Sequence, residues 1–531
     1  MVCAIKCASR GIRATLVSPY PSERAQSVMA AGGINAVLAS NGEDDTVDSH
    51  IEDTIKGGCF LGGKNAVKGL CSRAEEIIRY LEGIGTVFSV DKTGHPAKRA
   101  FGGQSHKRTY YCGASTGKQI VSALVMEARR YEAEGLISRR IGSFFHSALI
   151  RDGVCYGALL FDERAGELVS VYADALVMAV GGQNALFGKT TGSTLCDGYA
   201  AGKLFTQGVT LKNLEFIQYH PTAIETGQKR MLVSEAVRGE GGRLFYEEQG
   251  ERVYFMEDKY GPGGNLMTRD VISREIDACR RDVYLDISFL DGKLIDERLP
   301  EVRDICRKYR NIDIKKEPIP VSPSVHFFMG GLAVRLNHET NIGNLFAVGE
   351  CASMYHGANR LGGNSLLAAV YGGIVAAEEI ADRESASEAP DFGSYLRDEQ
   401  EKLIRQAESK SNFPVMMLRD DLAKIMRERL GIVRNEESLK KGVADIELDL
   451  YAAERLKFDP SVSAYANYSL SAILTAARAT LTCALERRES RGAHFRSDFP
   501  KSDDGYLYPT LISWDGGAYR VSYDREGIYE N

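Results

Sequence analysis

The spacing of apolar residues at the start of the chain predicts a helix followed by a strand. Apolar positions recur at helical spacing through residues 1–9, Gly11 follows as a helix-ending residue, and 12–17 form an apolar run. This order is the second half of a β-α-β unit, and the chain begins after the first strand. The small residues at 30–36 then predict a place where backbone approaches a ligand closely.

The middle of the chain alternates between helical and strand patterns. Residues 45–83 are mostly helical in pattern, and a loop rich in Gly, Ser, Lys and Tyr precedes a second helical stretch. The expected elements are the loop 101–116, the helix 118–134, and the strands 147–150, 157–161 and 174–180. The last of these strands runs directly into Gly181 and Gly182, which predicts a second nucleotide contact.

In the second half, the composition changes twice. Residues 214–320 are richer in charged residues and loop signals, which indicates an inserted domain. A strand at 344–348 then leads into Gly349 and Glu350, and an apolar helix is expected at 365–377. Residues 391–491 have helical periodicity, and we expect the polar and aromatic tail from residue 497 to be irregular.

Length and charge narrow the class of protein. A chain of 531 residues predicts roughly two to four domains. With 66 basic and 72 acidic residues the net charge is −6, so we expect no nucleic-acid partner. Apolar runs such as 366–377 contain glycines and fall short of the ~20 residues of a membrane span. We therefore expect any membrane contact to be made through a partner.

The eleven cysteines are scattered and never form a C-x-x-C pair. This spacing favours reduced thiols and a cytoplasmic protein over a secreted disulfide framework, and no signal peptide is visible. Iron–sulfur clusters and zinc sites usually need clustered thiolates, so we predict no metal site on this chain. Any iron–sulfur carrier would belong to another chain.

Polar residues gather in five ordered segments where a hydrophobic core would not need them. The segments are 218–222 (QYHPT), 234–242 (SEAVRGEGG), 267–270 (MTRD), 326–331 (HFFMGG) and 356–366 (HGANRLGGNSL), followed late in the chain by 488–494 (RESRGAH). Taken singly, each is a weak signal. Together and in this order, from residue 1 to about 500, they resemble the fumarate reductase and succinate dehydrogenase flavoprotein family, which includes L-aspartate oxidase.

The resemblance implies an α/β fold with three parts. A Rossmann-type FAD-binding domain would be interrupted by a capping domain and followed by a mainly helical C-terminal domain. The expected boundaries are 1–213 and 326–385 for the two parts of the FAD-binding domain, 214–325 for the capping domain, and 386–531 for the helical domain and tail.

The resemblance also assigns roles to individual residues. The flavin would lie along Ser27, Gly32, Gly33, Gly181, Gly182, Asp197, Glu350 and the backbone of Asn364, Ser365 and Leu366. The C4-dicarboxylate site would contain His220, Ser234, Glu235, Arg269, His326 and Arg360, with Ser234 standing where relatives often have Thr.

These residue types suit a substrate with two negative charges. Arg360 can hold one carboxylate through paired donors, while His326, His220 and Ser234 hold the other groups. Arg269 would donate a proton to one alkene carbon while the flavin delivers hydride to its neighbour, and Glu235 with Arg238 would return the proton from solvent. The alternative, in which Arg269 only clamps substrate charge, stays open.

Two features depart from the family pattern. Relatives begin with a strand and a G-x-G-x-x-G turn that cradles the FAD pyrophosphate, and we expect a segment of roughly a dozen residues upstream to supply it. Otherwise FAD binding should be weak. Gln26 stands where membrane-bound relatives usually carry the histidine that bonds to the flavin, so we expect non-covalent FAD.

Three functions remain open at this point. The first is fumarate reduction, or its reverse, by a flavoprotein subunit in anaerobic electron transport. Its expected electron carrier is an iron–sulfur subunit, in a complex at the inner face of the cell membrane. The second is L-aspartate oxidase, and the third is a non-catalytic flavoprotein. Aspartate oxidases tend to carry Glu at the position of Phe101, where it can offset the substrate ammonium, so Phe101 favours fumarate or succinate.

Overall fold

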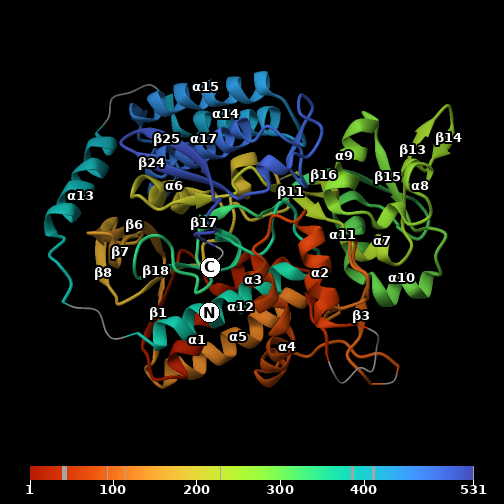
Figure 1. Ribbon diagram of the computed structural model, residues 1–531, viewed down its shortest axis with the longest axis horizontal. Helices are drawn as coiled ribbons and strands as arrows, with labels where there is room; N and C mark the ends of the chain where they lie inside the picture. The colour runs from red at the N-terminus through yellow and green to blue at the C-terminus, as the bar shows by residue number, and fades with distance from the viewer. Residues whose placement is uncertain are drawn as a thin grey trace.

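The computed structural model describes residues 1–38, 45–92, 94–113, 115–227, 229–383, 388–408 and 413–529. Residue 114 of the predicted loop and residues 409–412 of the predicted helical region lie outside the described residues. Figure 1 shows three groups of elements: an α/β body with α1, α4 and α5 at its base, a cap at one end, and a layer of long helices above the body.

The α/β body is assembled from two stretches of chain. Its helices are α1 (Val2–Ala8), α2 (Val47–Gly57), α3 (Lys64–Ser72), α4 (Ala74–Gly83), α5 (Thr116–Ala133), α6 (Tyr199–Thr206) and α12 (Asn364–Ala381). Its strands are β1 (Ala14–Ser18), β2 (Ile34–Asn35), β3 (Lys98–Arg99), β4 (Thr109–Tyr110), β5 (Ile137–Ile141), β6 (Ser143–Arg151), β7 (Val154–Asp162), β8 (Glu167–Tyr172), β9 (Leu176–Met178), β10 (Leu211–Lys212), β17 (Gly331–Ala333), β18 (Leu345–Ala347) and β19 (Ala352–Ser353).

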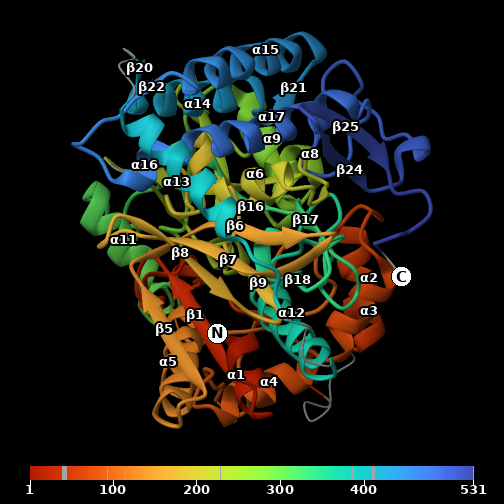
Figure 2. The same cartoon turned by 90° about the vertical axis from the view of Figure 1, so that its left-hand side faces the viewer.

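Parallel strand pairs join segments that are distant in sequence. β1 pairs with β5, and β9 pairs with β18, so that the chain after the cap returns to the sheet that it left. β6, β7 and β8 form an antiparallel sheet of the body, which lies above α1 and α5 and below the upper helices in Figure 2. β6 and β7 overlap the predicted strands 147–150 and 157–161, although β6 begins four residues earlier than expected, and β8 was not predicted.

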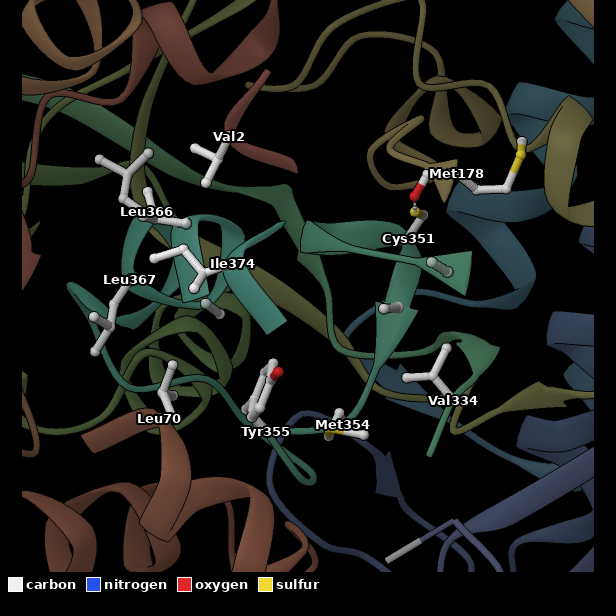
Figure 3. Close-up of a cluster of buried hydrophobic side chains, with 14 of the residues drawn as sticks. Val2, Leu70, Met178, Val334, Cys351, Met354, Tyr355, Leu366, Leu367 and Ile374 are labelled. Atoms are coloured by element: carbon white, nitrogen blue, oxygen red, sulfur yellow. Dashed lines mark hydrogen bonds between the residues drawn. The ribbon is translucent and has the colours of Figure 1, made fainter. Parts of the chain in front are cut away.

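The core of the body forms around α12. Val2 of α1 packs with Leu366, Leu367 and Ile374 of α12, as Figure 3 shows, and Leu70 of α3 lies below them. α12 is apolar along most of its length because it is buried on several faces, which explains why the sequence there has no amphipathic period.

The cap is a six-stranded sheet with helices packed against it. Its strands are β11 (Ile217–Glu225), β12 (Arg230–Leu232), β13 (Arg243–Glu248), β14 (Glu251–Val253), β15 (Val283–Asp286) and β16 (Ile319–Phe328), in the spatial order β12-β11-β16-β15-β13-β14. Its helices are α7 (Ala236–Gly239), α8 (Phe255–Tyr260), α9 (Arg269–Cys279), α10 (Gly292–Arg298) and α11 (Pro300–Arg310). Residues from Ile224 to Val321 form a separate hydrophobic core. The inserted unit is present as expected, while its boundaries at 214 and 325 remain a prediction.

Helices dominate the region after the body. They are α13 (Gly393–Ala407), α14 (Val415–Arg429), α15 (Glu436–Ala453), α16 (Ala464–Tyr468) and α17 (Leu470–Glu486), with the short strands β20 (Phe413–Pro414), β21 (Val433–Arg434), β22 (Leu456–Lys457) and β23 (Phe495–Arg496). Within the described residues, no helix combines the length and the apolar character that crossing a membrane requires.

The prediction of an irregular tail is wrong. β24 (Thr510–Asp515) and β25 (Ala518–Tyr523) form a hairpin, and β24 pairs with β10 of the body in a five-stranded sheet. The two-residue turn Gly516–Gly517 has positive φ at both positions, as such hairpins require. Trp514 closes the hairpin against Phe205 of α6, at a ring distance of 5.7 Å.

Candidate active site

A cavity of about 1240 Å³ lies between the α/β body, the cap and α16. Most residues predicted to bind cofactor or substrate line it. They are Ser27, Gly32, Gly33, Phe101, Gly181, Gly182, Asp197, His220, Ser234, Glu235, Arg269, His326, Glu350, Arg360, Ser365 and Leu366. The fold therefore brings together residues that are more than 300 positions apart. Arg238 and Asn364 do not line the cavity and lie behind its wall.

The glycines of the wall sit where a side chain cannot. Gly33 has φ of +139°, and a Cβ there would lie 2.4 Å from the carbonyl oxygen of Tyr110. A Cβ on Gly182 would lie 2.3 Å from Oε1 of Glu350. Both positions leave bare backbone facing the cavity, as a closely held ligand requires.

The amino terminus of α12 forms another part of this wall. Ser365 and Leu366 line the cavity, and the first N–H groups of this 18-residue helix have no partner within the helix. The side chain of Asn364 points away, because its Oδ1 accepts a 2.8 Å hydrogen bond from Asn35 and its Nδ2 donates to Thr54. The side chain of Asn364 is therefore engaged within the protein, and a contact between its backbone and the flavin stays a prediction.

These features fit FAD. Pockets for drug-sized ligands measure about 300–1,000 Å³, and this cavity exceeds that range, as a dinucleotide with a small substrate beside it requires. Backbone at Gly33 and Gly182 and the start of α12 would hold the flavin nucleotide. The N–H groups at the helix start offer donors to its electron-rich atoms.

Two buried carboxyl groups face the same part of the cavity. Asp197 accepts hydrogen bonds from the Tyr465 hydroxyl at 2.9 Å and from the Tyr199 N–H at 3.1 Å. Glu350 accepts a hydrogen bond from the Phe328 N–H at 3.0 Å. Burial raises the pKa of Asp197, and burial raises the pKa of Glu350 to about 7, so Glu350 is poised between its charged and neutral forms.

At the other end of the cavity, Arg269 and Glu235 form a tight ion pair. Arg269 begins α9, and its Nη2 and Nε lie 2.7 and 2.9 Å from Oε2 of Glu235. The second oxygen of Glu235 accepts a hydrogen bond from the Gly102 N–H at 2.9 Å. The loop 101–104 thus reaches across to the cap and fixes the carboxylate from the other side.

Arg238 lies behind Glu235. Its Nη2 is 3.6 Å from Oε1 of Glu235, and its Nη1 donates to the carbonyl oxygen of Asn265 at 2.8 Å. Its Nε and Nη2 have no hydrogen-bond partner among the described residues, although the side chain is fully buried. The predicted order Arg269–Glu235–Arg238 is therefore present as a continuous line of contacts.

Arg360 approaches the cavity from the loop before α12. Its guanidinium lies 4.2 Å from the ring centroid of Phe327, and its Nε has no hydrogen-bond partner among the described residues. Gln218 connects it to Arg269, since Oε1 of Gln218 accepts from both guanidiniums.

Two histidines and a serine complete this end of the cavity. The rings of His220 and His326 meet edge to face at 5.2 Å between centroids. Nδ1 of His326 lies 3.0 Å from the hydroxyl of Thr191, and the Ser234 hydroxyl accepts a 3.3 Å hydrogen bond from the Ala236 N–H. All three side chains line the cavity, so each offers a polar group to a ligand.

The electrostatics of this end favour an anion. Within the described part of the chain, three guanidiniums from Arg238, Arg269 and Arg360 face the carboxylate of Glu235. Burial alone would raise the pKa of Glu235, but the charges of Arg269 and Arg238 lower it to about 2, so Glu235 is ionised. Burial, followed by these arginine charges, lowers the pKa of His220 well below its usual range.

The remaining groups cancel this positive charge only in part, because Glu350, the other carboxyl group that acts on Arg360, has a pKa raised by burial to about 7. Burial, then the nearby His220 and Arg269, lowers the pKa of His326 well below its usual range, so both histidines are neutral at pH 7. Burial and the charge of Arg269 also lower the pKa of Arg360, yet a guanidinium keeps its proton at neutral pH in proteins. The lowered pKa reports a cation that lacks a full counter-charge.

Phe101 lies among these groups without adding charge. Its side chain is buried, lines the cavity, and comes within 3.1 Å of the position of a Cβ on Gly32. Gln26 also lines the cavity, and its Nε2 lies 3.5 Å from the carbonyl oxygen of Thr191. Phe101, where aspartate oxidases tend to carry Glu, and Gln26, where membrane-bound relatives usually carry the flavin-linking histidine, thus both face the cavity.

Three residues with contacts at the site were not expected from the sequence. Gln218 was visible only as part of the 218–222 segment, Thr191 lies in a loop without a distinctive pattern, and Tyr465 comes from α16 of the C-terminal region. Periodicity could not identify them. Their proximity depends on the register of β11 against β16 and on the docking of α16.

Comparison with known proteins agrees with this geometry. A family described as "FAD binding domain" matches residues 1–366, and one described as "Fumarate reductase flavoprotein C-term" matches residues 419–529. The chain is 37% identical to the succinate dehydrogenase flavoprotein subunit of Bacillus subtilis, over 96% of this chain and 91% of that protein. It is 32% identical to the fumarate reductase flavoprotein subunit of Haemophilus influenzae, over 97% and 90%.

A solved quinol–fumarate reductase with menaquinol molecules superimposes with a TM-score of 0.90 at 30% identity, covering 98% of this chain and 95% of that one. The fold is therefore an FAD-binding domain with a capping domain and a helical C-terminal domain. The chain belongs to the fumarate reductase and succinate dehydrogenase flavoprotein family and is an FAD-dependent oxidoreductase of that type.

Proposed function

We propose that this protein interconverts fumarate and succinate, with reduction of fumarate as the favoured direction. The observation that carries the proposal is the charge at the cap end of the cavity, where three buried guanidiniums face one ionised carboxylate and two neutral histidines. A dianion with a carboxylate at each end balances this excess. A neutral or cationic substrate would leave buried charge uncompensated.

The binding groups suit both ends of such a substrate. Arg360 has an unpartnered Nε and a planar fork, which suits one carboxylate bidentately. His220, His326 and Ser234 offer donors for the other polar atoms. The neutral rings can each donate one hydrogen bond without adding further charge.

When bound and reduced by the electron carrier, the flavin would supply the hydride that one alkene carbon of fumarate receives. Arg269 would deliver the proton to the neighbouring carbon, so that two electrons and two protons in all convert fumarate to succinate. The ion pair with Glu235 at 2.7 Å supports this role, because a proton that Glu235 receives from the Arg238 side can pass directly to the deprotonated Arg269. In the alternative role, Arg269 would only anchor substrate charge.

Glu235 and Arg238 would connect Arg269 to solvent. Glu235 contacts Arg269 through Oε2 and approaches Arg238 through Oε1, so a proton can pass across the carboxylate. The two unpartnered nitrogens of Arg238 offer the next contact, which would be donated to water or to another hydrogen-bond acceptor.

L-Aspartate oxidase is the second candidate that the family contains. Its substrate carries an ammonium group, and Phe101 offers that group no counter-charge. The ionised Glu235 is already engaged by Arg269 and by the Gly102 N–H. This arrangement favours fumarate over aspartate.

We further propose that FAD is bound non-covalently, because Gln26 has no nucleophilic nitrogen with which to bond the flavin. Acid precipitation of the holoprotein should release the flavin into the supernatant. Yellow colour that stays in the washed pellet would contradict this part of the proposal.

The electron carrier is proposed to be an iron–sulfur subunit, since relatives are named as flavoprotein subunits. The complex would lie at the cytoplasmic face of the cell membrane. Purification of the chain together with the products of neighbouring genes tests this directly, because co-purifying iron and acid-labile sulfide are expected.

The function itself is tested by comparing substrates on purified holoprotein. Fumarate should be reduced by a reduced dye much faster than succinate is oxidised, and aspartate should not drive oxygen consumption. Faster oxidation of aspartate than reduction of fumarate would identify the oxidase instead. Absence of both activities in FAD-loaded protein would favour a non-catalytic flavoprotein.

A further inference from the structure

Gln218 occupies a position behind the cavity wall, between the two arginines that face the substrate. It belongs to β11 of the cap sheet, is fully buried, and lies where the register of β11 against β16 shifts between Gln218 and Tyr219. This irregularity allows the side chain to turn toward the arginines. A glutamine at full burial needs partners for each of its polar atoms.

Every hydrogen-bonding position of this amide is in use. Oε1 accepts from Nη1 of Arg269 at 2.9 Å and from Nη2 of Arg360 at 3.0 Å. Nε2 donates to Oδ1 of Asn359 at 2.7 Å and to the carbonyl oxygen of Arg360 at 2.8 Å. The amide therefore holds the Arg360 backbone, its neighbour and both guanidiniums at once.

The two guanidiniums reach this point from separate parts of the molecule. Arg269 begins α9 of the cap, whereas Arg360 lies in the loop before α12 of the α/β body. Like charges repel in a buried site, so a shared acceptor is needed to fix how far apart they stand. A neutral amide provides that acceptor without removing the positive charge that a dianion needs.

We propose that Gln218 is a positioning residue that sets the separation of the Arg269 and Arg360 guanidiniums and thereby restricts the site to four-carbon diacids. The inference rests on the proposed function, since it concerns the substrate of the same site. Gln218 acts through the arginines and need not touch the substrate itself.

Chain-length preference separates this role from a merely structural one. The dissociation constants of malonate, succinate and glutarate are measured on FAD-loaded protein by the change in flavin absorbance. The native protein should prefer the four-carbon diacid by about tenfold or more, which is ~1.4 kcal/mol. Gln218→Ala removes the shared acceptor, so the three dissociation constants should come to lie within about threefold of one another. That spread is smaller than the tenfold preference expected of the native protein.

Gln218→Glu separates spacing from charge. The carboxylate keeps an acceptor in the same place, so the preference for four carbons should persist. Its negative charge neutralises part of the site, so all three diacids should bind weaker by on the order of 100-fold. Gln207→Glu is the matched control, because Gln207 is another hydrogen-bonded glutamine, contacts Ala148 and Tyr395, and does not line the cavity. It should change neither affinity nor preference.

Parallel weakening of all three diacids in Gln218→Ala, with the preference unchanged, would overturn the inference. If Gln218→Ala does not retain FAD, Gln218→Asn carries the same test, because the shorter side chain withdraws the acceptor from both arginines. A native protein that binds none of the three diacids would contradict the proposed function. If the native protein and all Gln218 variants bind succinate with the same preference over malonate and glutarate, only the role of Gln218 is contradicted.

Discussion

The molecule contains two clusters of buried arginines, and the two clusters are built differently. The site cluster comprises Arg238, Arg269, Arg360 and Glu235. The C-terminal cluster comprises Arg434, Arg487, Arg491 and Arg496 with Glu215, Glu489, Asp498 and His494. Within the described residues, the first has one carboxylate for three guanidiniums, whereas the second has three for four.

The C-terminal cluster satisfies its cations almost completely. Arg487 donates to Glu215 at 2.6 Å, to Glu489 at 2.8 Å and to the carbonyl oxygens of Tyr506 and Tyr508 at 2.7 Å. Despite burial, which acts in the opposite direction, the charges of Glu215 and Glu489 raise the pKa of Arg487. Arg360 shows the reverse, because burial and the charge of Arg269 lower its pKa.

The difference separates a structural use of arginine from a functional one. A cluster whose charges are paired holds segments of chain together, and here it joins the end of α17 to the loops before β24. A cluster with unpaired charge is costly unless a ligand completes it. The site cluster arises from motifs that the family resemblance singled out, whereas the late motif 488–494 supplies only Glu489, Arg491 and His494 of the C-terminal cluster.

The largest expected effect comes from removing the proton of Arg269. Arg269→Gln should lower fumarate turnover by roughly 10²–10⁴-fold, because both general-acid help and a cation are lost. A dicarboxylate inhibitor should still bind through Arg360 and the two histidines. Turnover and the dissociation constant of the inhibitor are measured side by side.

Arg269→Lys is the companion variant, since it keeps the charge but shortens the reach and loses the planar fork. If Arg269 is only an anchor, turnover and inhibitor binding should fall together in Arg269→Gln, and Lys should restore much of both. That pattern would remove the proton-donor role while leaving the charge argument intact.

Substitution of Arg487 should have the opposite effect to substitution of Arg269, because it should lower stability and leave turnover nearly unchanged. Arg487→Met leaves Glu215 without the cation that it contacts at 2.6 Å, and breaking such a buried pair costs about 3–5 kcal/mol. We expect a large fall in the thermal unfolding midpoint, with near-normal turnover per folded, FAD-loaded molecule. The adjacent, exposed Arg488→Met is the matched control and should shift stability by no more than about 0.5 kcal/mol. A stable Arg487→Met with impaired turnover would make the two clusters functionally alike.

Much of the fold could be predicted from apolar spacing. The first helix, the strand into Gly181 and the apolar helix at 365–377 correspond to α1, β9 and α12, because each has a period or a glycine boundary that local rules describe. The hairpin β24–β25 was missed although Gly516–Gly517 is a strong turn signal between two alternating runs. The aromatic and polar side chains of the tail concealed the alternation.

The residues of the candidate site could be predicted from motifs, but the hydrogen bonds that link them could not. His220, Glu235, Arg269, His326 and Arg360 face one cavity, but no spacing rule indicates that Gln218 bridges two arginines 51 and 142 positions away. Such contacts depend on strand register and on the docking of the cap against the body. His494 illustrates the converse, because it lies in a motif yet is buried against Arg434 and the carbonyl oxygen of Arg487.

The pH dependence of stability should report whether Glu350 is charged in the folded protein. Burial raises the pKa of Glu350 from 4.5 to about 7, so between these values the folded state binds more protons than the unfolded state. Stability from this group is therefore fully present below pH 4.5 and is lost as the pH rises to about 7, by about 3 kcal/mol in all. Thermal midpoints of the holoprotein across this range should fall less in Glu350→Gln than in the native protein. Identical slopes would mean that Glu350 is ionised throughout and that the site cluster has a second counter-charge.

The smallest expected effect concerns Phe101, the apolar residue beside the site cluster. Phe101→Glu introduces a carboxylate into the cavity, which should weaken fumarate binding by about tenfold, or ~1.4 kcal/mol, because like charges approach there. The same carboxylate offers a partner to a substrate ammonium, so aspartate oxidation should rise relative to fumarate reduction. Phe101→Leu is the control, since it stays apolar and should keep the native preference. The ratio of kcat/KM for the two substrates is measured in all three proteins. A ratio that changes equally in Phe101→Leu would show that packing against Gly32 sets the preference, and the excess positive charge of the site cluster would then not be what excludes aspartate.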